Sequence, residues 1–439
     1  MGRYRKYGFA AAAGLALLAF VCGCAAAPPF KTEASTVQET VQEPGASGET
    51  DVSGDTVRIS LNQENTEEER ETDPARSREE EFLESMSLRE KAAQMFVVLP
   101  EGLLSASESE QTEGKEELLD NGAVIRAGEP MENAYEEIPV GGFIYMKSNL
   151  KDPEQTKALL SGLSSYSEKR FGIPSFQCVD EEGGTVARIG GRTEFGLPNV
   201  GDIEKIGETK DTRKALEAGK TIGAYLKELG FNVDFAPDAD VLTNPANQVV
   251  KRRSFGSDPK LVSDMALAVE QGLGESGVYG VFKHFPGHGA TEGDTHEGYA
   301  YTSKSLNELW DCELLPFRRA SENGADFIMA GHIVLPNVAG DNTPASLSEK
   351  LLTGLLRETI GYDGIIVTDA MNMGAIVSRY SSAEAAVQAV IAGADIILMP
   401  EDLRSAWEGL VEAVESGEIS EERIDASVRR ILEVKLRQE

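Results

Sequence analysis

Basic residues, cysteine and histidine are all scarce in this sequence of 439 residues. The chain has 42 lysines and arginines against 74 acidic residues, which gives a formal net charge of −32, and it has 4 cysteines and 4 histidines. So little positive charge is a poor match for the phosphates of a nucleic acid, and we expect no nucleic-acid partner. Neutral and cationic ligands remain compatible with this charge.

The small number of cysteines excludes two further classes of protein. Beyond residue 24 the sequence contains only Cys178 and Cys312, which are too few for a disulfide framework and lack the CxxC spacing of a zinc cluster. We expect them to be two small buried side chains. A single bridge between them is the alternative.

The N-terminus has the pattern of a bacterial export signal. Three basic residues among the first six precede an apolar run at 9–21, which is too short for a comfortable membrane span. The run ends in Val-Cys-Gly-Cys, which resembles a lipobox, so residues 1–24 are predicted to be a lipoprotein signal peptide with Cys24 as the lipidated residue. A lipid would anchor the protein to the bacterial cell membrane on its extracytoplasmic side. The alternative is a plain signal peptide cut near residues 25–27.

Two acidic stretches follow the signal. Residues 25–78 are rich in Glu, Thr, Ser, Gln and Gly and nearly free of aromatic residues, so they are predicted to form a disordered acidic linker. A second acidic stretch, 101–137, comes after the first predicted strand of the folded part. We expect it to be an insertion on the surface.

The rest of the chain alternates between two kinds of pattern. Eight short runs rich in β-branched or aromatic residues lie at 95–99, 142–146, 175–180, 232–236, 280–284, 327–330, 365–369 and 396–399. Segments of helical spacing between and after them include 212–229, 259–275, 306–322, 383–392, 403–415 and 421–436. Strands that alternate with helices form a parallel sheet, and eight such units favour a closed barrel. We therefore predict an α/β fold, a single (β/α)8 TIM-type barrel over residues 79–439.

Polar and charged residues cluster where these predicted strands end. They are Asp180, Asp238, Asp240, Lys283, His284, His332 and Asp369. The carboxyl ends of the strands meet on one face of a barrel, and enzymes with this fold have their active sites there. The sequence therefore predicts that these side chains converge on an active site.

All four histidines lie between residues 284 and 332, which raises the question of a metal site. His284 and His288 have a spacing that metal ligands use. Pro286 and Gly287 lie between them, however, and forbid the helix that would place both rings on one face. Acid/base chemistry is the better interpretation, because histidine titrates near neutral pH.

Asp294 and His296 form the pair best suited to that chemistry. They are two residues apart in a predicted loop, so the carboxylate can fold back to orient the imidazole and raise its basicity. The alternative for Asp294 is a turn-forming role after Gly293.

Six separated motifs stand out along the chain. They are Met86-Ser-Leu-Arg-Glu-Lys-Ala-Ala-Gln-Met95, Val179-Asp-Glu-Glu-Gly-Gly-Thr-Val-Ala-Arg188, Phe231-Asn-Val-Asp-Phe-Ala-Pro237, Arg253-Ser-Phe-Gly-Ser-Asp-Pro259, Lys283-His-Phe-Pro-Gly-His-Gly289 and Val367-Thr-Asp-Ala-Met-Asn-Met373. In this order they resemble glycoside hydrolase family 3, in its bacterial β-N-acetylglucosaminidase (β-N-acetylhexosaminidase) branch. The resemblance runs from about residue 82 to the C-terminus.

The resemblance implies a role for eight residues. It makes Asp369 the nucleophile and the Asp294–His296 pair the acid/base dyad, in which a histidine replaces the second carboxylate of most retaining glycosidases. The residues that it implies hold the sugar are Asp180, Arg188, Arg253, Lys283 and His284.

The function implied is a retaining β-N-acetylglucosaminidase that removes terminal β-linked N-acetylglucosamine from cell-wall-derived glycosides in peptidoglycan turnover. Two alternatives stay open: a phosphorylase that uses phosphate as the acceptor, and a non-catalytic sugar-binding lipoprotein. A β-glucosidase is less favoured, because such relatives take their acid/base from a second domain and this sequence ends soon after the predicted barrel. The expected partners are a carbohydrate and, through the lipid anchor, the membrane. No cofactor or metal is implied.

Overall fold

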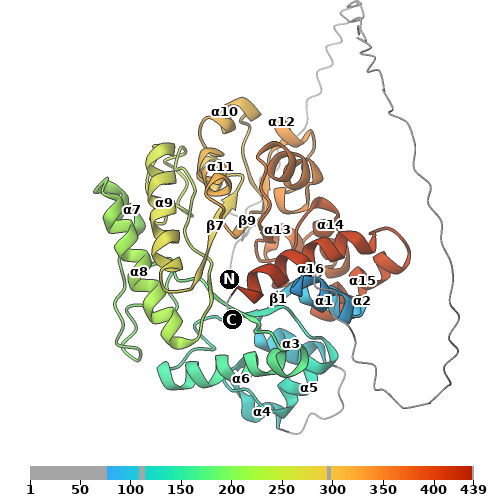
Figure 1. Ribbon diagram of the computed structural model, residues 1–439. Helices are drawn as coiled ribbons and strands as arrows, with labels where there is room; N and C mark the ends of the chain where they lie inside the picture. Colours follow the sequence, from blue (N-terminus) through green and yellow to red (C-terminus); the bar gives the residue numbers. More distant parts are fainter. Residues whose placement is uncertain (1–76, 108–113, 294–297, 438–439) are drawn as a thin grey trace, which may run out of the picture. The chain divides into compact units, whose positions relative to one another are not determined.

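The computed structural model describes residues 77–107, 114–293 and 298–437 (Figure 1). The predicted signal peptide, the lipidated Cys24 and the predicted linker up to residue 76 lie outside these ranges. Among the described helices, none has both the length and the apolar character needed to cross a membrane.

Eight strands form one parallel sheet, and each of the eight predicted runs overlaps one of them. They are β1 (Phe96–Val98), β4 (Gly142–Ile144), β5 (Phe176–Val179), β6 (Val233–Asp234), β7 (Tyr279–Phe285), β9 (Phe327–Ala330), β11 (Ile365–Thr368) and β12 (Ile397–Leu398). Their order in the sheet is β11-β9-β7-β6-β5-β4-β1-β12, so strands that are consecutive in this set are neighbours in space. The strand residues are buried almost without exception, as expected of parallel strands covered on both faces.

The first and last strands of this order meet and close the sheet. Val367 and Ile396 form a parallel bridge between the β11 and β12 segments. The buried Asp395 beside this bridge accepts the backbone N–H of Ile366 at 2.9 Å and pairs with Arg357. The α/β fold with a TIM-type barrel is therefore confirmed.

Helices cover the outside of the barrel (Figure 1). They are α1 (Arg78–Ser85), α2 (Leu88–Gln94), α3 (Pro100–Ala106), α4 (Lys115–Leu118), α5 (Glu129–Glu137), α6 (Pro153–Phe171), α7 (Ile203–Glu208), α8 (Thr212–Leu229), α9 (Pro259–Gly274), α10 (Leu306–Trp310), α11 (Leu315–Glu322), α12 (Pro336–Ala339), α13 (Gly374–Val377), α14 (Ser382–Ala392), α15 (Leu403–Glu415) and α16 (Glu421–Leu436). A π-helical turn, Lys350–Thr359, follows β9. Two short pairs of strands complete the described part: β2 (Leu119–Asp120) with β3 (Ala123–Val124), and β8 (Ala300–Tyr301) with β10 (Ile333–Val334).

The long helices begin and end at residues that satisfy their free backbone groups. Asp152 caps α6 through the N–H of Gln155, Pro153 occupies the first turn, and Gly172 ends the helix in the left-handed region at φ 74°. Helix α8 lies against α9, and the two approach through glycines. A Cβ on Gly219 would come within 2.2 Å of the Val269 carbonyl oxygen, so no other residue fits there.

Two expectations from the sequence are wrong in detail. The acidic stretch 101–137 is not a surface insertion, because α3, α5 and the β2–β3 pair fold within it and bury Leu103, Val124 and Tyr135. The predicted helix 306–322 is two helices, α10 and α11, since a turn intervenes before Pro316 in the first turn of α11. Neither difference alters the barrel.

The amino-terminal end of the barrel holds a buried cation. Lys435 of α16 is fully buried, donates to the Gln94 Oε1 at 2.8 Å and lies 5.1 Å from the centre of the Phe176 ring. Burial lowers the pKa of Lys435 to about 7. Both cysteines of the barrel are free: Cys178 is buried near Lys435 and Cys312 is half-buried.

Stability should therefore depend on pH through Lys435. In an unfolded chain a lysine titrates at about 10.4, so between pH 7 and that value the unfolded state binds more protons than the folded state. The free energy of unfolding should rise with pH across this window by up to about 1.4 kcal/mol per pH unit, and Lys435→Met should lose this contribution. Urea unfolding of both proteins from pH 6 to 9.5 measures the difference. The exposed Lys214→Met is the control and should keep the wild-type slope; equal slopes for Lys435→Met and wild type would contradict the assignment.

Candidate active site

A cavity of about 300 Å³ opens at the carboxyl ends of the strands. Six of the residues predicted to form the site line it: Asp180, Arg188, Arg253, Lys283, His284 and Asp369. Asp180 directly follows β5, Lys283 lies near the end of β7, and Asp369 directly follows β11. The barrel thus brings together side chains that are up to 189 residues apart in the sequence.

The Lys283 ammonium group lies at the centre of an ion-pair network. It is 3% exposed and lies 2.9 Å from the Asp180 Oδ1 and 2.7 Å from the Glu182 Oε1. Burial lowers the pKa of Lys283, but the two carboxylates outweigh burial and raise the pKa above its ordinary value. Burial likewise raises the pKa of Asp180, while Lys283 and Arg188 bring its pKa below the ordinary value. Lys283 and Asp180 are therefore both charged at neutral pH.

Arg253 and Glu182 form the second part of this network. The guanidinium donates two hydrogen bonds to the Glu182 carboxylate, from Nε at 2.7 Å and from Nη2 at 2.6 Å. Burial raises the pKa of Glu182, but Arg253 and Lys283 outweigh it and the pKa lies well below its ordinary value. A two-point contact of this kind fixes the plane of the guanidinium. Glu182 was not among the residues assigned from the sequence, although it lies inside a quoted motif.

A buried glutamate shapes the loop that carries Arg188. The Glu181 carboxylate accepts the backbone N–H groups of Arg188, Ile189 and Gly190 at 2.6, 3.0 and 2.8 Å, and the Tyr225 hydroxyl at 2.9 Å. Four donors satisfy a charge that burial would otherwise make costly. The loop is held so that the Arg188 Nη2 reaches the Asp180 Oδ2 at 3.2 Å.

His284 is oriented by a buried carboxylate. Its Nδ1 lies 2.8 Å from the Asp240 Oδ2, so the Nδ1–H donates to Asp240, and its Nε2 lies 3.4 Å from the Arg253 Nη2. The backbone N–H of His288 also donates to Asp240. Burial raises the pKa of Asp240, but His284 and His288 lower it below the ordinary value.

Asp369 lies on the cavity wall with its own set of neighbours. Its Oδ1 accepts the N–H of Ala370 at 2.8 Å. Burial raises the pKa of Asp369, yet His332 and His284, the Ala370 N–H and Lys283 together lower the pKa below its ordinary value. The carboxylate is therefore ionised at neutral pH, as a nucleophile must be.

His332 supports the turn that follows Asp369. Its Nε2–H donates to the Ala370 carbonyl oxygen at 2.9 Å, and its Nδ1 lies 2.7 Å from the Ser346 Oγ. Burial lowers the pKa of His332, with Asp369 acting in the opposite direction. These two contacts fix the orientation of the ring and hold the turn that follows Asp369.

One group of the described residues has the composition of a metal site. Asp238, Asp240 and His284 each place one potential ligand atom within 4.8 Å of the others. Asp240 accepts from His284, whereas the buried Asp238 Oδ2 lies 3.5 Å from the Arg253 Nε and has no hydrogen-bond partner among the described residues. Burial and the neighbouring Asp240 raise the pKa of Asp238 well above its ordinary value.

The residues of the predicted acid/base dyad, Asp294 and His296, lie in 294–297, outside the described residues. The chain on either side is fixed, because Glu292 and Tyr301 form a two-way backbone bridge at 2.9 and 3.0 Å. The Tyr299 ring lies under the Arg379 guanidinium, with 4.3 Å between the ring centre and the Arg379 Cζ. Arg379 belongs to the connection that follows Asp369.

The comparison with known proteins identifies the family. Residues 87–434 match the family described as glycosyl hydrolase family 3 N terminal domain. The chain therefore belongs to glycosyl hydrolase family 3.

Within this family, the chain is similar to proteins described as beta-hexosaminidases and β-N-acetylglucosaminidases. Beta-hexosaminidase A of Pseudoalteromonas piscicida is 34% identical over 322 residues, which cover 67% of this chain and 53% of that protein. Beta-hexosaminidase LpqI of Mycobacterium tuberculosis is 35% identical over 271 residues, which cover 60% of this chain and 68% of that protein. The solved family 3 β-N-acetylglucosaminidase of Paenibacillus sp. FPU-7 has a TM-score of 0.72 and 36% identity, covering 80% of this chain and 63% of that one. The chain thus spans about half the length of the first of these relatives.

The Glu182 carboxylate should be essential for the stability of this site. Glu182→Ala leaves the buried Arg253 and Lys283 short of a partner, and breaking a buried ion pair costs about 3–5 kcal/mol of unfolding free energy. Glu228→Ala is the control. The Glu228 side chain is 72% exposed and its ion-pair partner Lys157 is 44% exposed, so this pair should contribute about 0–1 kcal/mol to the unfolding free energy. Urea unfolding measures both. A loss for Glu182→Ala no larger than that of the control would contradict the network described.

Proposed function

We propose that this protein is a retaining β-N-acetylglucosaminidase that releases terminal β-linked N-acetylglucosamine from cell-wall-derived glycosides. The observation that carries the proposal is an ionised carboxylate, Asp369, on the wall of a cavity whose other charged side chains are paired with one another. The hexosaminidase and β-N-acetylglucosaminidase relatives support the choice of sugar.

The lining of the cavity suits an uncharged sugar. Its carboxylates, Asp180, Glu182 and Asp369, are matched by three basic side chains, Arg188, Arg253 and Lys283. Sugar hydroxyls both donate and accept hydrogen bonds, so they can join such a network without adding charge. In this proposal Asp180, Arg188, Arg253, Lys283 and His284 hold the terminal sugar.

The first chemical step is attack by Asp369. A carboxylate oxygen bonds to the anomeric carbon while the bond from that carbon to the leaving-group oxygen breaks, through an oxocarbenium-like transition state. His296, oriented by Asp294, gives the leaving oxygen a proton. The products of this step are a covalent glycosyl-aspartate and the free alcohol.

Water completes the cycle. His296, now neutral, takes a proton from a water molecule whose oxygen attacks the anomeric carbon, and the Asp369 carboxylate is released. Two inversions at one carbon retain the β configuration. The contact between Tyr299 and Arg379 supports this assignment, because it joins the end of the 294–297 connection to the segment that follows Asp369.

The place of action is proposed from the sequence alone. A lipid on Cys24 and an acidic linker after it would hold the barrel outside the cytoplasm and near the membrane. Fragments of peptidoglycan are found there, so the enzyme would act in peptidoglycan turnover.

Replacement of Asp369 should abolish turnover. Asp369→Asn keeps the size of the side chain but removes the nucleophile, so we expect kcat for an aryl β-N-acetylglucosaminide to fall by at least about 10³-fold. Azide added to Asp369→Gly should restore release of the phenol, with an α-glycosyl azide as the product, because azide takes the place of the carboxylate. Asp326→Asn, whose carboxylate pairs with Arg437 away from the cavity, is the control. Near wild-type turnover by Asp369→Asn would show that another residue is the nucleophile.

Product analysis distinguishes hydrolysis from the two alternatives. The same aryl glycoside is incubated with wild-type protein in the presence and absence of phosphate, and the sugar products are separated by chromatography. We expect free N-acetylglucosamine under both conditions. A sugar 1-phosphate formed only with phosphate would instead identify a phosphorylase, and binding without any product would identify a sugar-binding protein.

A further inference from the structure

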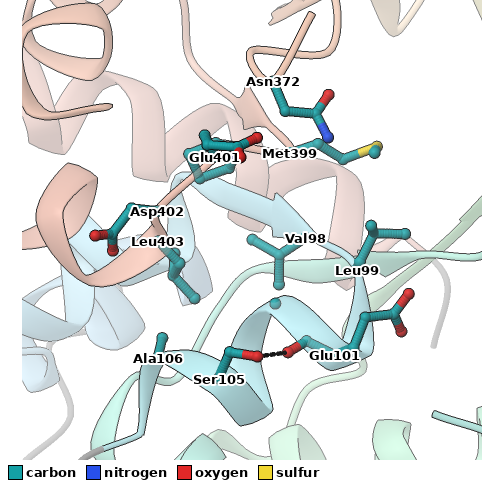
Figure 2. A pocket seen from close by; sticks show the side chains of 12 residues that line it. Val98, Leu99, Glu101, Ser105, Ala106, Asn372, Met399, Glu401, Asp402 and Leu403 are labelled. Atoms are coloured by element: carbon teal, nitrogen blue, oxygen red, sulfur yellow. Dashed lines mark hydrogen bonds between the residues drawn. The ribbon is translucent and has the colours of Figure 1, made fainter. Parts of the chain in front are cut away.

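A second cavity shares lining residues with the sugar cavity, and Figure 2 shows this second cavity from close by. Its volume is about 500 Å³, and Asn372 and Met399 line both cavities. Its other walls come from the segment 98–106, at the end of β1 and in α3, and from the turn 400–403 between β12 and α15. In Figure 2, Asn372 and Met399 lie at the top of the view, with Ser105 and Ala106 at the bottom.

The second cavity opens beside the nucleophile. Asn372 lies three residues after Asp369, in the same turn. Asp369 attacks one face of the anomeric carbon and the leaving group departs from the opposite face, so the leaving group has to extend out of the sugar cavity into adjoining space. The second cavity provides such space, because Asn372 and Met399 line both cavities.

The lining of this cavity has a definite chemistry. Asn372 offers an amide that can donate to and accept from a sugar hydroxyl, and Met399 offers an apolar surface. The charged residues of the lining are Glu101, Glu401 and Asp402, and none of the described residues that line it is basic. Glu401 and Asp402 are exposed, whereas Glu101 is partly used inside the fold, where its Oε2 accepts from the Asn149 Nδ2 at 2.9 Å.

The negative charge of this cavity contrasts with the sugar cavity, where acidic and basic side chains balance. A carboxylate or phosphate on the leaving group would meet three carboxylates with no cation among the described lining residues. An uncharged hydroxyl or amide would meet no such repulsion, and an ammonium group would be attracted.

We propose that the second cavity binds the leaving-group sugar and that Glu401 and Asp402 select leaving groups that are uncharged or cationic over those that carry a carboxylate or a phosphate. This inference rests on the proposed function, since it assigns the second half of the same substrate. In this proposal the two carboxylates favour amino-sugar leaving groups, and leaving groups whose carboxylate is amidated, over a muramic acid with a free carboxylate.

Space continues beyond this cavity for a longer leaving group. A neighbouring hollow of about 560 Å³ shares Ser105, Ala106 and Asp402 with it. Arg404 lies in that hollow but pairs with Glu137 and Glu408. The acidic character therefore extends along the path that the substrate would follow.

The test compares two disaccharides that differ only in charge. One is N-acetylglucosamine β-1,4-linked to N-acetylmuramic acid, and the other is the same compound with its lactyl carboxylate converted to the amide. For the wild-type chain we expect kcat/KM for the amide to exceed that for the acid by about tenfold. The double variant Glu401→Gln/Asp402→Asn should reduce this ratio to near one. Asn at position 402 can still accept the Ser405 N–H that Asp402 now accepts at the start of α15, so the helix cap is kept.

Two controls keep the result interpretable. Because the readout is a ratio from one preparation, partial loss of folded protein cancels, and Glu415→Gln, which removes a charge from the exposed end of α15, should leave the ratio unchanged. For the wild-type chain, raising sodium chloride to about 0.5 M should also shrink the ratio, since exposed carboxylates are screened.

Failure of this inference can be told apart from failure of the proposed function. An aryl β-N-acetylglucosaminide is measured beside the two disaccharides. If it is hydrolysed while the acid and the amide react equally, or while the ratio resists both the double variant and salt, the inference is wrong and the proposed function stands. If no substrate releases N-acetylglucosamine, the proposed function fails and the inference falls with it.

Discussion

The buried ammonium of Lys283 is the constraint on which the site depends. A cation that is 3% exposed is tolerated only with charged partners in contact, and Asp180 and Glu182 provide them at 2.9 and 2.7 Å. Those two carboxylates in turn require Arg188 and Arg253. One buried charge at the end of β7 thereby fixes side chains from two other segments of the barrel, residues 180–188 and the loop that carries Arg253.

The same network determines what the cavity can bind and do. Because its cations are matched by carboxylates, the cavity attracts a neutral, hydroxyl-rich ligand more than a charged one. Lys283, His284 and His332 also act together to keep the Asp369 carboxylate ionised despite its burial. In the proposed function, sugar binding and the reactivity of Asp369 therefore arise from one set of interactions, and in the further inference the charge of the second cavity adds a separate selection of the leaving group.

The sequence predicted the barrel well because the barrel follows from local patterns. Seven of the eight strands lie within the predicted runs, and β7 extends one residue beyond its run at each end. Helices α8, α15 and α16 have the predicted bounds, since apolar periodicity and capping residues are encoded close together. The break before α11 was missed, because Pro316 is compatible with the start of a new helix as well as with a kink. The stretch 101–137 was misread, since its acidic residues outnumber the few apolar ones that it buries.

The site was predictable only where a motif pointed to it. Asp180, Lys283 and Asp369 stand at strand ends, so both position and motif identify them. Glu182 lies inside the motif 179–188 but not at a strand end, and its importance comes from Arg253, which is 71 residues away in the sequence. Glu101, Glu401 and Asp402 are brought together only by the closing of β1 against β12, which no local pattern reveals.

The central claim is that Asp369 forms a covalent bond to the sugar, and trapping that bond tests it most directly. The protein is incubated with a 5-fluoro-N-acetylglucosaminyl fluoride, whose fluorine slows hydrolysis of the intermediate, then digested and analysed by tandem mass spectrometry. The account predicts a glycosyl label on the carboxylate of Asp369. A label on a different residue, or turnover of the reagent with inversion at the anomeric carbon, would contradict it.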